Sequence, residues 1–149
     1  MLQRDMTQII LGLGSNLGDS EDNLRRAIKL IKLELLTDVL ESHIYKSAPL
    51  LPKNASADWN REFSNMVITG ELKQDLTPVD FLSRIKEYEA HLGRKPSAHW
   101  APREIDIDIL AWGNEIIDLP ALKIPHPEIL KRDFVMKPLL EILPGWKHP

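Results

Sequence analysis

The 149-residue sequence contains no cysteine, only seven glycines and few aromatic residues. The lack of cysteine excludes disulfide bonds, thiolate nucleophiles and cysteine-ligated zinc, and it fits a reducing compartment. Long apolar runs are also missing: the amino-terminal run covers residues 9–11 and is too short for a signal-peptide core or a membrane span. We therefore expect a cytoplasmic protein that has no membrane partner.

The charge balance disfavours a nucleic-acid partner. The formal net charge is −3 and the sequence pI is about 5.9, so the chain as a whole is repelled by a phosphate backbone. The length suits one domain, and no repeat, low-complexity tract or linker divides it. We expect a single domain over residues 1–149 and a monomer. Positive charge that holds an anion must be gathered locally.

Hydrophobic patterning predicts four strands and two helices. The strands are expected over 8–15, 39–45, 63–72 and 104–112, and the helices over 19–35 and 78–93. Polar stretches predict long loops over 49–61 and 94–103, and the proline-rich last third predicts only a short helix near 139–143. This order predicts an α+β fold: a ferredoxin-like split βαβ core with a mostly antiparallel sheet, both helices packed on one face and long active-site loops on the other.

The most informative stretch is residues 103–109. Side chains alternate along a strand, so the isoleucines here point one way while Asp106 and Asp108 point the other, with their Cα atoms roughly 6–7 Å apart. Two like charges on one face repel unless a cation lies between them, and a hard divalent cation with phosphate ligands would serve. On the strand alone, an ordinary amphipathic strand with its acids in water is equally compatible.

Basic residues gather near this stretch in a chain that is acidic overall. Guanidinium groups suit phosphate oxygens and the charge that builds during phosphoryl transfer. Taken singly, each arginine is compatible with a solvated surface charge. His126 is compatible with a helix-capping or core residue. The cluster comprises Arg94, Lys95, His99, Arg103, His126 and Arg132.

The glycine-rich stretch at residues 12–18 fails as a dinucleotide-binding fingerprint, because Leu17 stands where the third glycine is needed. No Gly-Lys-Ser/Thr follows, so a Walker loop is also absent, and the glycines are interpreted as turn and close-packing residues. Phe63 and Phe134 suit a hydrophobic core, but they also suit stacking on a flat heterocycle whose edge Asn65 reads.

Several blocks, in order, are similar to those of the 6-hydroxymethyl-7,8-dihydropterin pyrophosphokinase family. The resemblance extends from about residue 9 to residue 144, and its most specific parts are Arg-x-x-Asp-x-Asp and Pro-His-Pro-x5-Arg-x-Phe. The blocks are residues 11–19, 45–49, 63–65, Glu89 with 93–94, 102–109, and 125–134.

The resemblance implies a ferredoxin-like diphosphokinase of folate biosynthesis that moves diphosphate from ATP to the pterin hydroxymethyl group and releases AMP. It implies Mg²⁺ as cofactor, with two ions held by Asp106 and Asp108, and Arg94 and Arg103 completing the catalytic set. The implied ATP contacts are Glu89, Lys95, Trp100, Arg103, Ile109, His126 and Arg132. The implied pterin contacts are Ser47, Pro49, Leu50, Phe63, Asn65 and Phe134.

Two other functions remain open from the sequence. A ferredoxin-like nucleotide-binding or RNA-binding module could use Phe63 for base stacking, although the acidic charge argues against RNA. A pterin-sensing module could keep both ligand sites without turnover. Detection of AMP as product separates the kinase from both.

Overall fold

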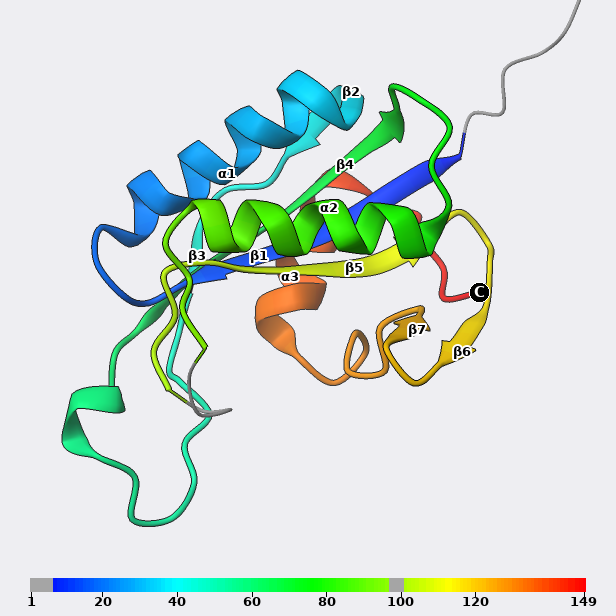
Figure 1. Ribbon diagram of the computed structural model, residues 1–149. Helices are drawn as coiled ribbons and strands as arrows, with labels where there is room; N and C mark the ends of the chain where they lie inside the picture. The colour runs from blue at the N-terminus through cyan, green and yellow to red at the C-terminus, as the bar shows by residue number, and fades with distance from the viewer. Residues whose placement is uncertain (1–6, 97–100) are drawn as a thin grey trace, which may run out of the picture.

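The computed structural model describes residues 7–96 and 101–149, which form a layered α/β domain (Figure 1). The strands are β1 Gln8–Ser15, β2 Leu36–Glu41, β3 Tyr45–Ser47, β4 Phe63–Leu72, β5 Asp106–Trp112, β6 Ile117–Leu119 and β7 Leu122–Ile124. The helices are α1 Ser20–Glu34, α2 Pro78–His91 and α3 Asp133–Ile142, with a short 3₁₀ helix at Ala57–Trp59. None of the helices in these two described ranges is long and apolar enough to span a membrane.

The main sheet is antiparallel, in the order β2-β4-β1-β5, with β3 paired to the start of β4. The central strand β1 is apolar along most of its length because helices cover both faces of the sheet. Its last residue, Ser15, pairs with Ser64 near the start of β4, and Gly14 pairs with Asp106 at the start of β5. The end of β1 therefore lies beside the beginnings of β4 and β5.

The predicted helices α1 and α2 are confirmed and share one face of the sheet. Asp19 caps α1 by accepting the Asp22 N–H at 3.1 Å, and the Thr77 hydroxyl accepts the Asp80 N–H at 3.1 Å before Pro78 opens α2. Their apolar faces bury Ile9, Leu11, Leu13, Ile107 and Ile109 from the sheet.

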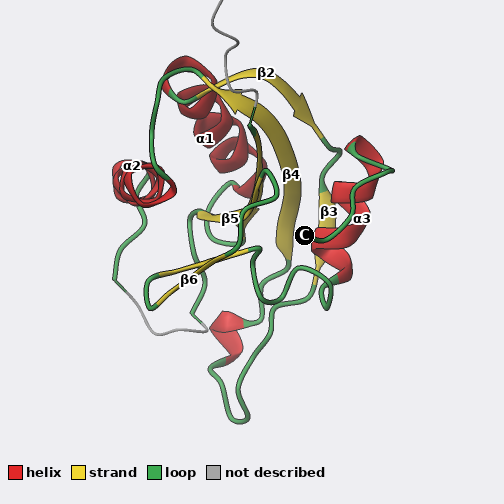
Figure 2. Cartoon of the chain, turned by 90° about the vertical axis from the view of Figure 1, so that its right-hand side faces the viewer, coloured by secondary structure: helices red, strands yellow, loops and turns green. Residues whose placement is uncertain are grey.

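The opposite face differs from the prediction because α3 covers part of it (Figure 2). We expected only loops there and a short helix over 139–143, but α3 begins at Asp133 and contains Pro138. Val135 and Leu139, one turn apart, pack on Ile10 and Leu110 of the sheet. This burial stabilises a helix that proline alone would disfavour.

The strand predicted over 39–45 is wrong in its bounds. The chain forms β2 immediately after α1, then leaves the ladder and returns as the separate strand β3. Between them the Ser42 hydroxyl accepts the Val67 N–H at 3.0 Å, and the Ser42 N–H donates to the Val67 carbonyl. These side-chain and main-chain bonds let the chain bend without leaving β4 unpaired.

The other predicted element bounds differ less from the observed ones. The strand predicted over 104–112 begins at Asp106, and the hairpin of β6 and β7 was not predicted, because its strands have three residues each. The loop over 49–61 is confirmed apart from the 3₁₀ turn within it. The described parts of the loop over 94–103 also lack a helix or strand.

Gly70 of β4 permits close approach of a bulge in β2. A Cβ atom at position 70 would lie 3.0 Å from the Thr37 carbonyl oxygen and 3.2 Å from a Val39 methyl. We expect Gly70→Ala to lower the free energy of unfolding by about 1–3 kcal/mol, measured by urea denaturation, because the bulge must shift. The matched control is Gly145→Ala, which meets nothing within 4 Å. Equal stability of both variants would contradict this packing.

Candidate active site

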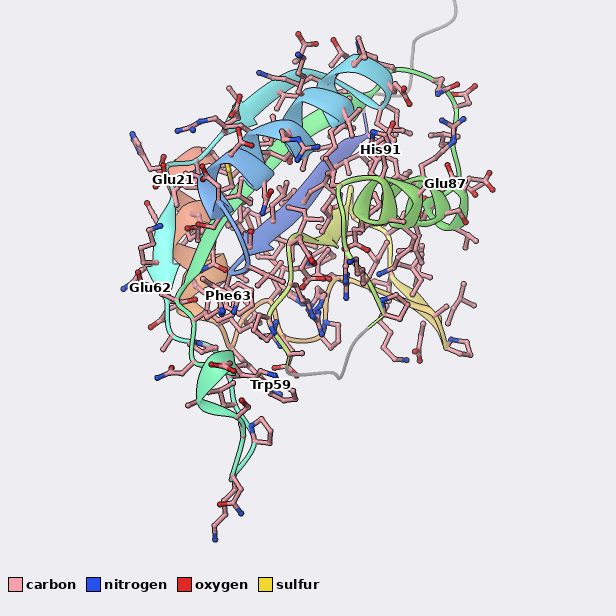
Figure 3. All side chains as sticks on the ribbon, turned by 60° about the vertical axis from the view of Figure 1, so that its left-hand side comes forward. Glu21, Trp59, Glu62, Phe63, Glu87 and His91 are labelled. Atoms are coloured by element: carbon pink, nitrogen blue, oxygen red, sulfur yellow. The ribbon has the colours of Figure 1, made fainter. Side chains whose placement is uncertain are left out.

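A cavity lies at the end of the sheet where β1 finishes and β4 and β5 begin, bordered by both long loops and α3. Figure 3 shows Phe63 at this end, near the loop that carries Trp59, while Glu87 and His91 lie away on α2. The empty volume of about 870 Å³ includes space that is open to solvent. Lining residues from the sheet include Gly12, Gly14, Phe63, Asn65, Met66, Asp106, Asp108 and Leu110.

The two aspartates of β5 share the cavity face of the sheet, as the alternation predicted. Asp106 and Asp108 line the cavity, whereas Ile107 and Ile109 are buried in the core beneath α1 and α2. Their neighbours on β1 are Gly14 and Gly12, so no side chain of β1 stands between the carboxylates and the cavity.

Asp106 is held in an ion-pair network that includes a buried glutamate. Its Oδ1 lies 3.1 Å from Arg94 Nη1 and 3.4 Å from Arg103 Nη1. Arg94 Nη1 also donates to Glu89 Oε2 at 2.7 Å, and that oxygen accepts the Ile107 N–H at 2.8 Å. Glu89 is 2% exposed, so it fixes Arg94 against β5 from the core side.

Asp108 has a different environment. Burial, followed by the nearby charges of Asp106 and Glu89, raises the pKa of its carboxyl group to about 7, against the opposing effects of Lys86 and Arg132. A carboxylate that faces other acids is stabilised by a cation placed among them. A bound cation would therefore stabilise the ionised form of the buried Asp108 carboxyl group.

The donor set fits Mg²⁺ on chemical grounds. Two carboxylates on one strand supply hard oxygen ligands, and no group of three or more His, Cys, Asp or Glu side chains within residues 7–96 and 101–149 could hold a metal by itself. Mg²⁺ is commonly held by one or two carboxylates, with water and substrate phosphates completing its octahedral shell. Asp106 and Asp108 are the residues that would hold it.

The other end of the cavity is aromatic and apolar. Phe63 from β4 and Phe134 from α3 both line it, with Met66 and Leu110 between the strands and the helix. Asn65 Nδ2 donates to Ser47 Oγ at 2.8 Å and to the Tyr45 carbonyl at 3.2 Å. The arrangement offers flat apolar walls with one amide group at the edge, which suits a planar heterocycle.

Gly14 provides space for this aromatic end. A Cβ atom there would lie 3.3 Å from Asn65 Oδ1 and 3.5 Å from a Phe63 ring carbon. The glycines at 12 and 14 were interpreted as close-packing residues, and the structure agrees, but they also line the cavity. Their spacing of two on a strand was the sequence signal for that second role.

Arg132 and His126 lie on the segment that leads into α3. The Arg132 guanidinium is 5.6 Å from the centre of the Phe134 ring and lines the cavity. His126 Nδ1 accepts the Glu128 N–H at 3.1 Å, which leaves Nε2 to carry the proton. Burial, aided by the Arg132 charge, lowers the pKa of His126, so it is a neutral hydrogen-bond donor at pH 7.

Asn16, which sequence reasoning missed, connects both loops to β1. Its main-chain N–H donates to the Arg103 carbonyl at 3.0 Å, and its Oδ1 accepts the Arg103 N–H at 2.8 Å. Its Nδ2 also donates to the Arg61 carbonyl at 3.1 Å. The only sequence signal was an asparagine after Gly-Ser at the end of a strand.

The other residues predicted to contact the ligands lie at the edge of the cavity, outside it, or outside the described residues. Leu50 and Ser47 line the cavity, and Pro49 lies between them in the chain, half-buried. Lys95 is exposed beside Arg94, and the Ile109 side chain is in the core, so a nucleotide contact there falls to its main chain. Trp100 and His99 lie outside the described residues. The ATP contacts of these residues and of Glu89 stay predictions.

Comparison with known proteins gives consistent results. The chain is 41% identical over 145 residues to 2-amino-4-hydroxy-6-hydroxymethyldihydropteridine pyrophosphokinase of Aquifex aeolicus, covering 97% of this chain and 85% of that protein. It is also 34% identical to the folate synthesis bifunctional protein of Chlamydia trachomatis, covering 91% of this chain but only 30% of that protein.

A crystal structure of Plasmodium falciparum HPPK-DHPS has the same fold with a TM-score of 0.70 at 15% identity, covering 98% of this chain and 43% of that one. This likeness confirms the ferredoxin-like α+β class. The model of the family 7,8-dihydro-6-hydroxymethylpterin-pyrophosphokinase (HPPK) matches residues 10–144. The chain therefore belongs to the 7,8-dihydro-6-hydroxymethylpterin-pyrophosphokinase family.

Proposed function

We propose that the chain transfers diphosphate from ATP to the hydroxymethyl group of 6-hydroxymethyl-7,8-dihydropterin in folate biosynthesis. Family membership supports the reaction. The observation that carries it to these residues is that one cavity holds both the carboxylates of Asp106 and Asp108 and the aromatic rings of Phe63 and Phe134. A cation-bound triphosphate and a flat ring then meet in the same space.

The ring end would bind the pterin. Phe63 and Phe134 are the residues for stacking on the heterocycle, and Asn65 is the residue for its polar edge. Ser47, Pro49 and Leu50 would complete the wall on the side of the first long loop. The hydroxymethyl group would then point towards the acidic end of the cavity, where the phosphates are held.

The acidic end would bind the triphosphate. Asp106 and Asp108 would hold two Mg²⁺ ions, whose positive charge would offset the negative charge of the phosphates. Arg94 and Arg103, which contact Asp106 in this structure, would offset the charge of the phosphate oxygens and of the leaving AMP. His126 and Arg132, with Lys95 and Trp100 on the second long loop, would contact the nucleotide.

The transfer is a single displacement at the β-phosphorus of ATP. The pterin hydroxyl oxygen bonds to the β-phosphorus, the bond from that phosphorus to the oxygen shared with the α-phosphorus breaks, and AMP leaves with that oxygen. The hydroxyl proton is released to water as the new bond forms. Closing loops would exclude water, which otherwise hydrolyses ATP. We also expect a cytoplasmic monomer that binds no nucleic acid.

The assay that tests the proposal separates AMP from ADP. Purified protein with ATP, Mg²⁺ and 6-hydroxymethyl-7,8-dihydropterin should give AMP and the pterin diphosphate by mass-resolved chromatography. Binding of both ligands without product would indicate a sensor. ADP as product, or no binding of the pterin, would contradict the assignment.

Removal of either carboxylate should abolish turnover. We expect Asp106→Ala and Asp108→Ala each to lower kcat at least about 100-fold, because phosphate charge is no longer neutralised, with the circular dichroism spectrum unchanged. The matched control is Asp118→Ala on β6, whose carboxylate pairs with Lys123 outside the cavity. Near-wild-type rates in both cavity variants would refute the metal role.

The Asp108 carboxylate should destabilise the protein when metal is absent. The folded pKa of Asp108 is about 7, above its ordinary value of 3.8, so the folded state loses stability relative to the unfolded state as pH rises between these values. With EDTA present, we expect Asp108→Asn to raise the thermal midpoint at pH 8 and to raise it much less at pH 4.5. A shift that is equal at both pH values would show that the Asp108 charge is not responsible.

A further inference from the structure

Glu141, near the end of α3, binds a segment almost a hundred positions earlier in the chain. Its Oε1 accepts the Tyr45 hydroxyl at 2.5 Å, and its Oε2 accepts the His43 main-chain N–H at 3.0 Å. Oε2 also lies 2.9 Å from His43 Nδ1. The carboxylate thereby joins α3 to the start of β3.

The position of this glutamate is electrostatically unfavourable for the helix alone. The last turn of a helix carries partial negative charge, and the last turn of α3 contains no basic residue to offset it. The three donor groups offset that repulsion. The Tyr45 hydrogen bond, with help from His43, lowers the pKa of Glu141, so the carboxylate is ionised at neutral pH.

The strand that receives this contact, β3, is short. β3 has three residues and pairs only with Phe63–Asn65 of β4 in the described sheet. Short ladders of this kind are marginally stable in water. The bond from Tyr45 to Glu141 attaches β3 to α3, the helix that carries Phe134 into the cavity.

Tyr45 also connects this attachment to the cavity. Its main-chain carbonyl and the Ser47 hydroxyl accept hydrogen bonds from Asn65 Nδ2, at 3.2 and 2.8 Å. Both amide hydrogens of Asn65 are thereby engaged on β3. Asn65 Oδ1 is left as the acceptor beside Gly14, where it suits an N–H donor on the edge of a heterocycle.

From this geometry we infer that Glu141 and Tyr45 are positioning residues for pterin recognition: their contact, which we call the clasp, holds β3 so that Asn65 presents Oδ1 to the pterin edge. Neither residue lines the cavity or touches the phosphate end. The inference rests on the proposed function. It adds the residues that hold Asn65 in place for pterin binding.

The test is a split between the two substrates. Titration calorimetry with 6-hydroxymethyl-7,8-dihydropterin, in the presence of Mg²⁺ and the unreactive α,β-methylene analogue of ATP, should give a higher Kd for Tyr45→Phe. The increase should reach up to about tenfold, because the arrangement of β3 that binds the pterin becomes less populated. Glu141→Ala should raise it at least as much. In both variants, the Kd of the ATP analogue alone should stay within about twofold of the wild-type value, a difference of less than about 0.5 kcal/mol.

The chain offers a matched control. The Tyr88 hydroxyl donates to Glu34 Oε2 at 2.6 Å between α2 and α1, on the other face of the sheet, so Tyr88→Phe removes a similar bond away from the cavity. It should leave the pterin Kd unchanged.

Three results would overturn the clasp: an unchanged pterin Kd in Tyr45→Phe, equal weakening of both ligands, or failure of both Tyr45→Phe and Glu141→Ala to fold. Absence of pterin binding by the wild-type protein would instead refute the proposed function.

Discussion

The alternation of side chains along β5 is the constraint on which the site depends. It places Ile107 and Ile109 in the core beneath two helices and, with the same geometry, turns Asp106 and Asp108 into the cavity. A shift of one residue in the register between β1 and β5 would bury both acids in the apolar core. The burial of the isoleucines therefore fixes the direction of the carboxylates.

The surrounding groups show how the protein tolerates this concentration of negative charge. Arg94 and Arg103 compensate Asp106, and Glu89 holds Arg94 from the buried side. Asp108 lacks a comparable ion pair among the described contacts, and burial, followed by the charges of Asp106 and Glu89, raises the pKa of its carboxyl group. A stable fold alone would not require such an acid, whereas a site for cations and phosphates does.

Much of the fold could be predicted from the sequence because local signals agreed with tertiary packing. The strands Gln8–Ser15 and Phe63–Leu72 were predicted with their observed bounds, and both long helices begin at side-chain caps. The failures lie where long-range contacts decide. The proline-rich last third suggested only a short helix near 139–143, but packing on the sheet stabilises the longer helix α3. The division of β2 from β3 depends on the Ser42 bonds to Val67.

The candidate site was predictable to the same degree. The acidic pair and the aromatic residues follow from strand geometry and from family resemblance, and the structure brings them to one cavity. Asn16 and Glu141 were not predictable, because each bonds to groups far away in the sequence. No periodic pattern marks a residue whose role is to hold another segment in place.

A crystal structure with Mn²⁺, the α,β-methylene analogue of ATP and the pterin would show directly, from the anomalous signal of manganese, what the two carboxylates bind. We expect manganese at the carboxylates of Asp106 and Asp108, on the cavity face of the sheet, with the pterin ring between Phe63 and Phe134. Manganese bound elsewhere, or a pterin bound away from these two acids, would contradict this expectation.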